Sequence, residues 1–147
     1  MVNFKKILCP YDFSENADEA LRYAVKLANP NTEICLLNII QLPYLIDPYG
    51  FVYYDEKADQ LKKDVESAME KKINELNERY KGFVFSPHIA VNNDPAEVIL
   101  QKQKEAGCEM VIMGSHGRKG LKRLLMGSVA ETVLREADCP VLIIKHK

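Results

Sequence analysis

The sequence predicts an α/β protein in which helices cover an open parallel sheet. Short apolar segments alternate with longer segments of helical periodicity from one end of the chain to the other. Strands that are separated by helices pair in parallel through right-handed crossovers. A chain of 147 residues can bury a sizeable core but is too short to argue for two domains, so residues 1–147 are expected to form one domain.

The first part of the chain is predicted to supply two strands and one helix. Residues 4–10 form a short apolar strand, and Ser14 then offers an N-cap for an amphipathic helix that stops before Pro30. A second strand is expected at residues 33–40. Residues 42–54 follow as a loop rich in proline and aromatic side chains, which either packs over the sheet or acts as a lid or a partner surface.

The middle of the chain is predicted to hold a long helix, a strand and a well-capped helix. Residues 55–80 are highly charged but carry one apolar stripe at helical spacing. A third strand is expected at residues 83–91. The run Asp-Pro-Ala-Glu that begins at Asp94 has the pattern of a capping box, and Gly107 is placed to end the helix that it opens.

The last part of the chain is predicted to add two strands and a helix. The fourth strand is expected at residues 109–113, the helix at residues 129–137 and the fifth strand at residues 141–145. Ser128 is followed three residues later by Glu131, which is the spacing of a capping box, so these two residues are expected to cap the final helix.

The composition argues against several classes of partner. The formal net charge is −1 and charges of both signs are mixed, so neither a nucleic-acid face nor a polybasic membrane patch is indicated. No segment approaches the roughly 20 apolar residues of a membrane helix, and the N-terminus lacks a signal-peptide pattern. A cytoplasmic location is therefore expected.

The cysteines are predicted to be structural. They lie far apart, without a CxxC motif or a nearby pair of histidines, and each falls within or beside a predicted strand; they are Cys9, Cys35, Cys108 and Cys139. This pattern favours buried, reduced thiols over metal ligands, so no metal-binding residues are assigned.

The glycine-rich run after the fourth strand is the strongest functional signal. Gly114 and Gly117 lie where a strand leads towards a helix, and Gly127 directly precedes that helix. Glycines allow a ligand to approach the backbone closely, and the N–H groups at a helix N-terminus attract anions. The run is a candidate phosphate cradle. The alternative is that the glycines only form the turn and that Ser128 only caps the helix.

The charged and polar side chains near this run can each either bind a ligand or have a purely structural role. His116 either donates to a phosphate or caps the turn, and Asp12, after the first strand, either contacts a ribose, an adenine or magnesium or only starts the next turn. Positive charge that could bind phosphate is concentrated in the loop, at Arg118, Lys119, Lys122 and Arg123. For Lys122 and Arg123 the favoured alternative is that they only form a solvated face. No Ser-His-Asp arrangement, paired carboxylates or Walker A spacing is evident, so no strong catalyst is expected.

Four segments together resemble the universal stress protein family. Cys-Pro-Tyr-Asp-Phe-Ser begins at Cys9, Met-Gly-Ser-His-Gly-Arg at Met113, Gly-Ser-Val at Gly127 and Cys-Pro-Val-Leu-Ile-Ile at Cys139. The resemblance covers the whole chain. Its most specific part is the spacing Gly-x2-Gly-x9-Gly-Ser, which in that family marks the members that bind ATP.

The resemblance implies a Rossmann-like sheet of order 3-2-1-4-5, with helices on both faces and ATP as the ligand. Magnesium or manganese would be held mainly by the phosphates. The first loop would flank the adenosine, the end of the second strand would line the adenine pocket, and the glycine run would hold ribose and phosphates. The residues assigned in this way are Pro10, Tyr11, Asp12, Ile39, Ile40, Met113, Gly114, His116, Gly117, Arg118, Gly120, Gly127, Ser128 and Val129.

The comparison with the family pattern also predicts a missing phosphate contact and a homodimer. Many ATP-binding relatives carry Ser or Thr where Ala130 stands, so one hydroxyl contact to phosphate is expected to be missing here. The resemblance implies a homodimer in which the strand at residues 141–144 pairs with its copy. An apolar edge strand leaves unpaired backbone groups that a twofold partner would satisfy, whereas the lysines that follow could instead shield the edge in a monomer.

Three functions are therefore weighed. The favoured one is a regulatory module of the stress response, in which ATP occupancy orders loops that an unidentified protein partner recognises. The second is a slow ATPase or nucleotide phosphotransferase that uses Asp12 with magnesium. The third is a dimeric interaction protein that binds no nucleotide and whose glycines are only structural.

Overall fold

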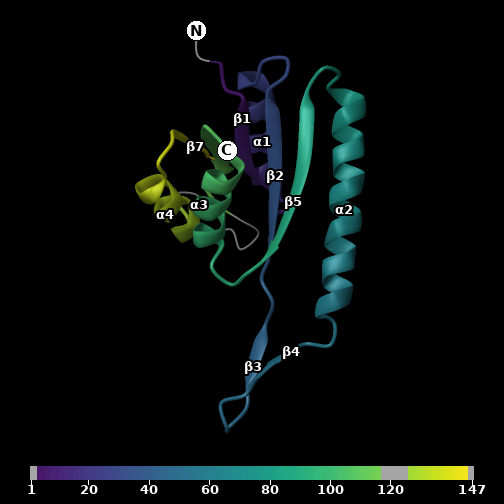
Figure 1. The fold of residues 1–147 in the computed structure, drawn as a ribbon, viewed down its shortest axis with the longest axis vertical. Helices are drawn as coiled ribbons and strands as arrows, with labels where there is room; N and C mark the ends of the chain where they lie inside the picture. The colour runs from purple at the N-terminus through teal and green to yellow at the C-terminus, as the bar shows by residue number, and fades with distance from the viewer. Residues whose placement is uncertain (1–2, 117–125, 146–147) are drawn as a thin grey trace.

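The computed structural model describes residues 3–116 and 126–145 and has the predicted architecture (Figure 1). Five parallel strands form one sheet in the order β5-β2-β1-β6-β7. Counted among the sheet strands alone, this is the order 3-2-1-4-5, so the predicted fold is confirmed. The strands are β1 Lys6–Pro10, β2 Glu33–Ile40, β5 Val84–Val91, β6 Met110–Gly114 and β7 Val141–Ile144.

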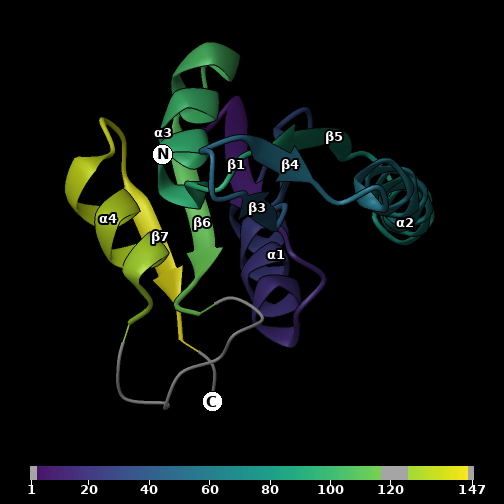
Figure 2. The same ribbon diagram turned by 90° about the horizontal axis from the view of Figure 1, so that it is seen from below.

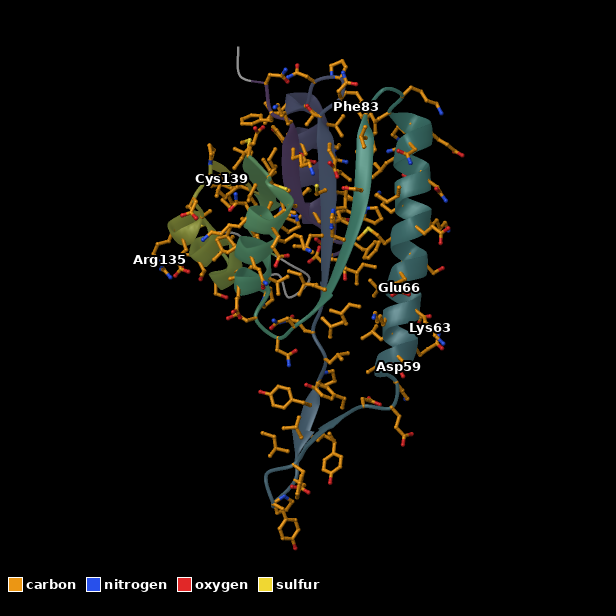
Figure 3. The ribbon with its side chains drawn as sticks, viewed as in Figure 1. Asp59, Lys63, Glu66, Phe83, Arg135 and Cys139 are labelled. Carbon is orange, nitrogen blue, oxygen red and sulfur yellow. The ribbon has the colours of Figure 1, made fainter. Side chains whose placement is uncertain are left out.

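Two helices pack on each face of the sheet (Figure 2). Helices α1 and α2 share one apolar cluster with the strands, and α3 and α4 share the other. Polar side chains cover their outer faces: Lys63 projects from α2, and Arg135 from α4, away from the sheet (Figure 3). No helix in the described part of the chain is both long and apolar enough to cross a membrane. The helices are α1 Glu15–Leu27, α2 Ala58–Arg79, α3 Pro95–Ala106 and α4 Ser128–Glu136.

Alternate residues of the central strands enter the two clusters. In β1, Ile7 and Cys9 pack towards α1 and α2, whereas Leu8 packs towards α3 and α4. This two-residue period, with both faces buried, explains why the buried cores of these strands, residues 7–9 of β1 and 34–37 of β2, are unbroken apolar runs. The Cys9 thiol is fully buried, and this burial raises its pKa to about 12, so it stays protonated at neutral pH.

Two of the predicted helix starts are confirmed in detail. The Ser14 hydroxyl accepts the N–H of Ala17 at the start of α1. The Asp94 carboxylate accepts the N–H of Glu97 at the start of α3. At the other end of α3, Gly107 takes a left-handed conformation with φ 67°, which an L side chain rarely adopts.

The predicted capping box at the start of α4 is wrong. The N-cap is Gly127, with extended backbone angles, and Ser128 is the first residue inside the helix. The carbonyl of Gly127 accepts the N–H of Glu131 at 3.0 Å, which fixes the start of the helix one residue earlier than the sequence suggested. No side chain caps this helix.

Residues 42–54 are not a loop that packs over the sheet, so that alternative is wrong. Strands β3, Tyr44–Ile46, and β4, Val52–Tyr54, pair antiparallel as a hairpin that extends beyond the rest of the fold (Figure 1). The carboxylate of Asp47 accepts two backbone N–H groups of the turn. Aromatic and β-branched residues favour strands even where they are exposed, as at Ile46 and Tyr53, which are 61% and 55% exposed. A role as a lid or a partner surface stays a prediction.

Truncation of Met69 tests the core. This residue of α2 is fully buried, so Met69→Ala should lower the free energy of unfolding by about 2–5 kcal/mol through lost contacts and a cavity. Leu45→Ala, in the exposed hairpin, should change it by less than about 0.5 kcal/mol. Urea unfolding followed by circular dichroism measures both, and equal losses would contradict the packing described here.

Candidate functional site

A cleft of about 720 Å³ opens at the carboxyl ends of the central strands. The strand order reverses between β1 and β6, because β1 is followed by β2 on one side of the sheet and β6 by β7 on the other. Ligands of open α/β sheets usually bind at such a point, and the cleft lies there. Its size suits a small ligand. The predicted residues that line it are Pro10, Tyr11, Asp12, Ile39, Ile40, Met113, Gly114, His116, Gly127, Ser128 and Val129. Three further predicted residues, Gly117, Arg118 and Gly120, lie outside the described residues.

Tyr11 is held at one wall of the cleft by both its backbone and its side chain. Its N–H donates to the carbonyl of Leu37 at 2.8 Å, and its carbonyl accepts the side-chain amide of Asn38 at 2.9 Å. The phenol donates to Asp18 at 2.6 Å, and the ammonium of Lys72 lies 5.5 Å from the ring centroid. Burial, together with the hydrogen bond to Asp18, raises the pKa of Tyr11 far above its ordinary value. The phenol is therefore neutral and already used in packing α1 against α2.

The next residues form a tight turn into α1. The carboxylate of Asp12 accepts the N–H and the hydroxyl of Ser14. Between them, Phe13 has φ 63°, in the left-handed region that residues with a side chain seldom occupy. Strain of this kind is commonly kept at binding sites, and here it brings Asp12 and Phe13 to the edge of the cleft.

Asn16, which no sequence pattern singled out, fixes the start of the glycine run. Its side chain is buried; the amide nitrogen donates to the carbonyl of Ile144 at 3.3 Å, and the amide oxygen accepts the N–H of His116 at 3.1 Å. A Cβ placed on Gly114 would lie 2.2 Å from that amide oxygen. Gly114 is thus required by the packing of Asn16.

The two described ends of the glycine run meet directly. The N–H of Gly127 donates to the carbonyl of Ser115 at 2.7 Å, and a Cβ on Gly127 would lie 3.0 Å from that oxygen. The side chain of His116 meets the Ser115 hydroxyl through Nδ1 at 3.0 Å. Its Nε2 is buried and has no hydrogen-bond partner among the described residues, so it is a polar atom that a ligand could satisfy.

The start of α4 offers backbone donors at the cleft. The N–H groups of Ser128, Val129 and Ala130 belong to the first turn and have no acceptor within the helix. Gly127 brings no side chain to cap them, and all three residues line the cleft. Together with the helix dipole, such donors favour a bound anion.

The opposite wall of the cleft is mainly apolar. Ile39 and Ile40 end β2, and side chains from α2 and α3 line the cleft with them. Sequence reasoning missed these residues, because they come from separate elements; they include Leu61, Val65, Pro95 and Ile99. It also missed Asn38, Gln41 and Asn93, although Gln41 directly follows β2 and could have been found from that position. An apolar wall facing anion-binding donors suits a flat base joined to phosphate.

Comparisons with known proteins show the family of the chain. The sequence profile of the universal stress protein family matches residues 3–145. The chain is 32% identical over 161 residues to the universal stress protein MJ0577 of Methanocaldococcus jannaschii, covering 99% of this chain and 98% of that protein. The solved structure of MJ0577 has a TM-score of 0.76 to this one at 30% identity, and the match covers 99% of each chain.

Two more distant structures share the fold. A universal stress protein in complex with cAMP has a TM-score of 0.71 at 16% identity, with 99% of this chain and 100% of that chain covered. A universal stress protein family member from Arabidopsis thaliana with AMP bound has a TM-score of 0.65 at 21% identity, with 97% and 92% covered.

A double-mutant cycle tests the contact between Asn16 and Gly114. Gly114→Ala should lower the free energy of unfolding by about 1–3 kcal/mol, because the new methyl group displaces the Asn16 amide and its hydrogen bonds. In the Asn16→Ala background the same change should cost less, since the clash is gone. Thermal or urea unfolding of the four proteins gives the coupling, and strictly additive losses would contradict the contact.

Proposed function

Since the chain belongs to the universal stress protein family, we propose that it is a nucleotide-binding regulatory protein of the stress response and that its ligand is ATP. The observation that carries this proposal is the cleft, in which an apolar wall faces the uncapped N-terminus of α4. The AMP and cAMP complexes of two structural neighbours lend support for an adenine nucleotide.

In this proposal the two walls bind different parts of ATP. The adenine lies against Ile39 and Ile40, and the first loop, residues 10–12, flanks the adenosine. The first-turn N–H groups of α4 and the His116 imidazole face the phosphates. Gly117, Arg118 and Gly120 complete the cradle, and magnesium or manganese is held mainly by phosphate oxygens.

A regulatory role fits the way in which the cleft is joined to the sheet edge. Asn16 holds both the His116 backbone, at the cleft, and the last residue of β7, Ile144.

Among the described strands, β7 has a neighbour only on its β6 side. We propose that β7 pairs with its copy in a homodimer; sedimentation velocity should then give a dimer, and a monomer at micromolar concentration would contradict this assembly.

The ligand is tested first. The purified, undialysed protein is denatured, and the released small molecules are identified by mass spectrometry. ATP, ADP, AMP and cAMP are then titrated into the stripped protein by calorimetry. ATP is expected to bind most tightly, because the α4 donors can reach more than one phosphate. If no nucleotide is released and none binds, the proposed function is wrong.

A matched pair of variants at Ser128 tests the phosphate wall. Proline is accepted at the first helical position, and Gly127 before it has ψ 153°, so Ser128→Pro should fold but lose one backbone donor. ATP affinity should fall about 10-fold or more, the effect of losing a hydrogen bond to a charged group. Ser128→Ala keeps the N–H and should bind ATP within about threefold of the parent protein. Equal affinities for both variants, measured by calorimetry, would place the phosphates elsewhere.

A further inference from the structure

A second group of ligand-type side chains lies away from the cleft, on the face of the sheet that α3 covers. Glu33 and Cys35 are two residues apart on β2, so they share a face. His88 on β5 pairs in register with Leu37 and is therefore diagonal to Cys35 on that face. One oxygen, the sulfur and one ring nitrogen of these three residues lie within 4.8 Å of one another.

A second thiol reaches the same place from another segment. Cys108 follows the end of α3, and its thiol lies beside that of Cys35. Both cysteines are almost fully buried. The side-chain amide of Gln103 donates to the Cys108 carbonyl at 2.8 Å, which fixes the backbone that carries the second thiol. Three separate segments thus bring four potential metal ligands together.

Hydrogen bonds already hold these groups in a converging arrangement. The hydroxyl of Ser86 donates to Glu33 at 2.7 Å and lies 3.3 Å from Nε2 of His88. The Cys35 sulfur is 3.6 Å from the same Glu33 oxygen, and Lys6 pairs with the other oxygen at 3.2 Å. The Ser86 hydroxyl is therefore at the centre of the group, and a rotation about its Cα–Cβ bond would move it aside.

We propose that Glu33, Cys35, His88 and Cys108 form a zinc-binding site. Thiolate, imidazole and carboxylate are the ligands that zinc uses, and in tetrahedral geometry their donor atoms lie about 3.6 Å apart. The donor atoms of Glu33, Cys35 and His88 lie within 4.8 Å of one another, so shifts of about 1 Å bring these three ligands to that spacing. Cys108, whose thiol lies beside that of Cys35, is the fourth ligand of the proposed site. Thiolates select zinc over magnesium or manganese, which prefer oxygen ligands.

The charges at this zinc site balance. On binding, each of the two thiols releases a proton to solvent and its sulfur forms a bond to the ion. Two thiolates and one carboxylate then leave a net charge of −1 around Zn²⁺, and the ammonium of Lys6, already paired with Glu33, offsets it. The ion would join β2 and β5 to the connection between α3 and β6, and so stabilise the fold.

The test uses the full chain, reduced and stripped of metal with a chelator. Zinc is titrated in competition with a chromophoric chelator, and Co²⁺ is added separately to look for thiolate-to-cobalt charge-transfer absorption. One equivalent of zinc, the cobalt band and a rise in melting temperature are expected. Cys35→Ser and His88→Ala should each weaken zinc binding by more than about 100-fold, beyond the loss caused by removing an outer-shell partner.

Matched controls separate this site from general thiol binding. Two cysteine variants should leave zinc affinity unchanged. Cys139→Ser alters a half-buried thiol just before β7 (Figure 3), and Cys9→Ser alters a thiol on the opposite face of the sheet. Ser86→Ala removes the bridging hydroxyl but no ligand, so zinc affinity should be kept or raised. Because His88 is only partly buried, His88→Ala should stay folded even if Cys35→Ser does not.

Several outcomes would overturn the proposal. These are the absence of stoichiometric zinc binding, binding without the thiolate-to-cobalt band, and an equal loss of affinity in Cys139→Ser and Cys35→Ser. Nucleotide binding is measured on the same variants and should not change. Failure of the zinc site is therefore distinguishable from failure of the proposed function.

Discussion

The buried amide of Asn16 is the interaction on which the cleft depends. Through it, α1 is joined to the backbone at His116 and to the last residue of β7, at distances of 3.1 and 3.3 Å. A buried amide without partners costs about 1–3 kcal/mol, so these two contacts are strongly favoured together. Because the amide fills the space beside Gly114, glycine is required there, and the chain must leave β6 along the floor of the cleft.

The closure of the glycine run explains why the N-terminus of α4 can stay without a side-chain cap. Gly127 closes against Ser115 at 2.7 Å, which positions the start of α4 without any side-chain cap. Glycine at an N-cap costs only a few tenths of a kcal/mol relative to serine or aspartate. The helix therefore keeps its free N–H groups at little expense in stability, and they remain available to an anion. Backbone strain at Phe13, with φ 63°, also lowers the stability of the fold, at the edge of the cleft beside Asp12.

The parts of the structure that sequence predicted correctly are those set by local chemistry. The strands that are buried on both faces have apolar centres, and Ser14 and Asp94 cap helices by contacts within three residues. Asn16 was missed because its partners are 100 and 128 residues away and leave no local pattern. Ser128 was misassigned because its spacing to Glu131 suits a capping box, whereas the closure onto Ser115 fixes the helix start at Gly127. At residues 42–54 the proline and aromatic content suggested a loop and left open whether it packs over the sheet; the structure has an exposed hairpin there.

Strand β2 separates the two proposed binding sites in both distance and chemistry. Glu33 lies at its first residue and Ile39 near its last, whereas Cys35 is four residues before Ile39, about 13 Å of extended chain at about 3.3 Å per residue. His88 is nearer still, because it pairs with Leu37, which lines the cleft. Phosphate oxygens at the cleft suit magnesium or manganese, whereas the thiols at the other end suit zinc. The two kinds of ion therefore need not compete for one set of ligands. Coupling between the sites would pass along β2, which pairs with buried β1 on one side and with the edge strand β5 on the other.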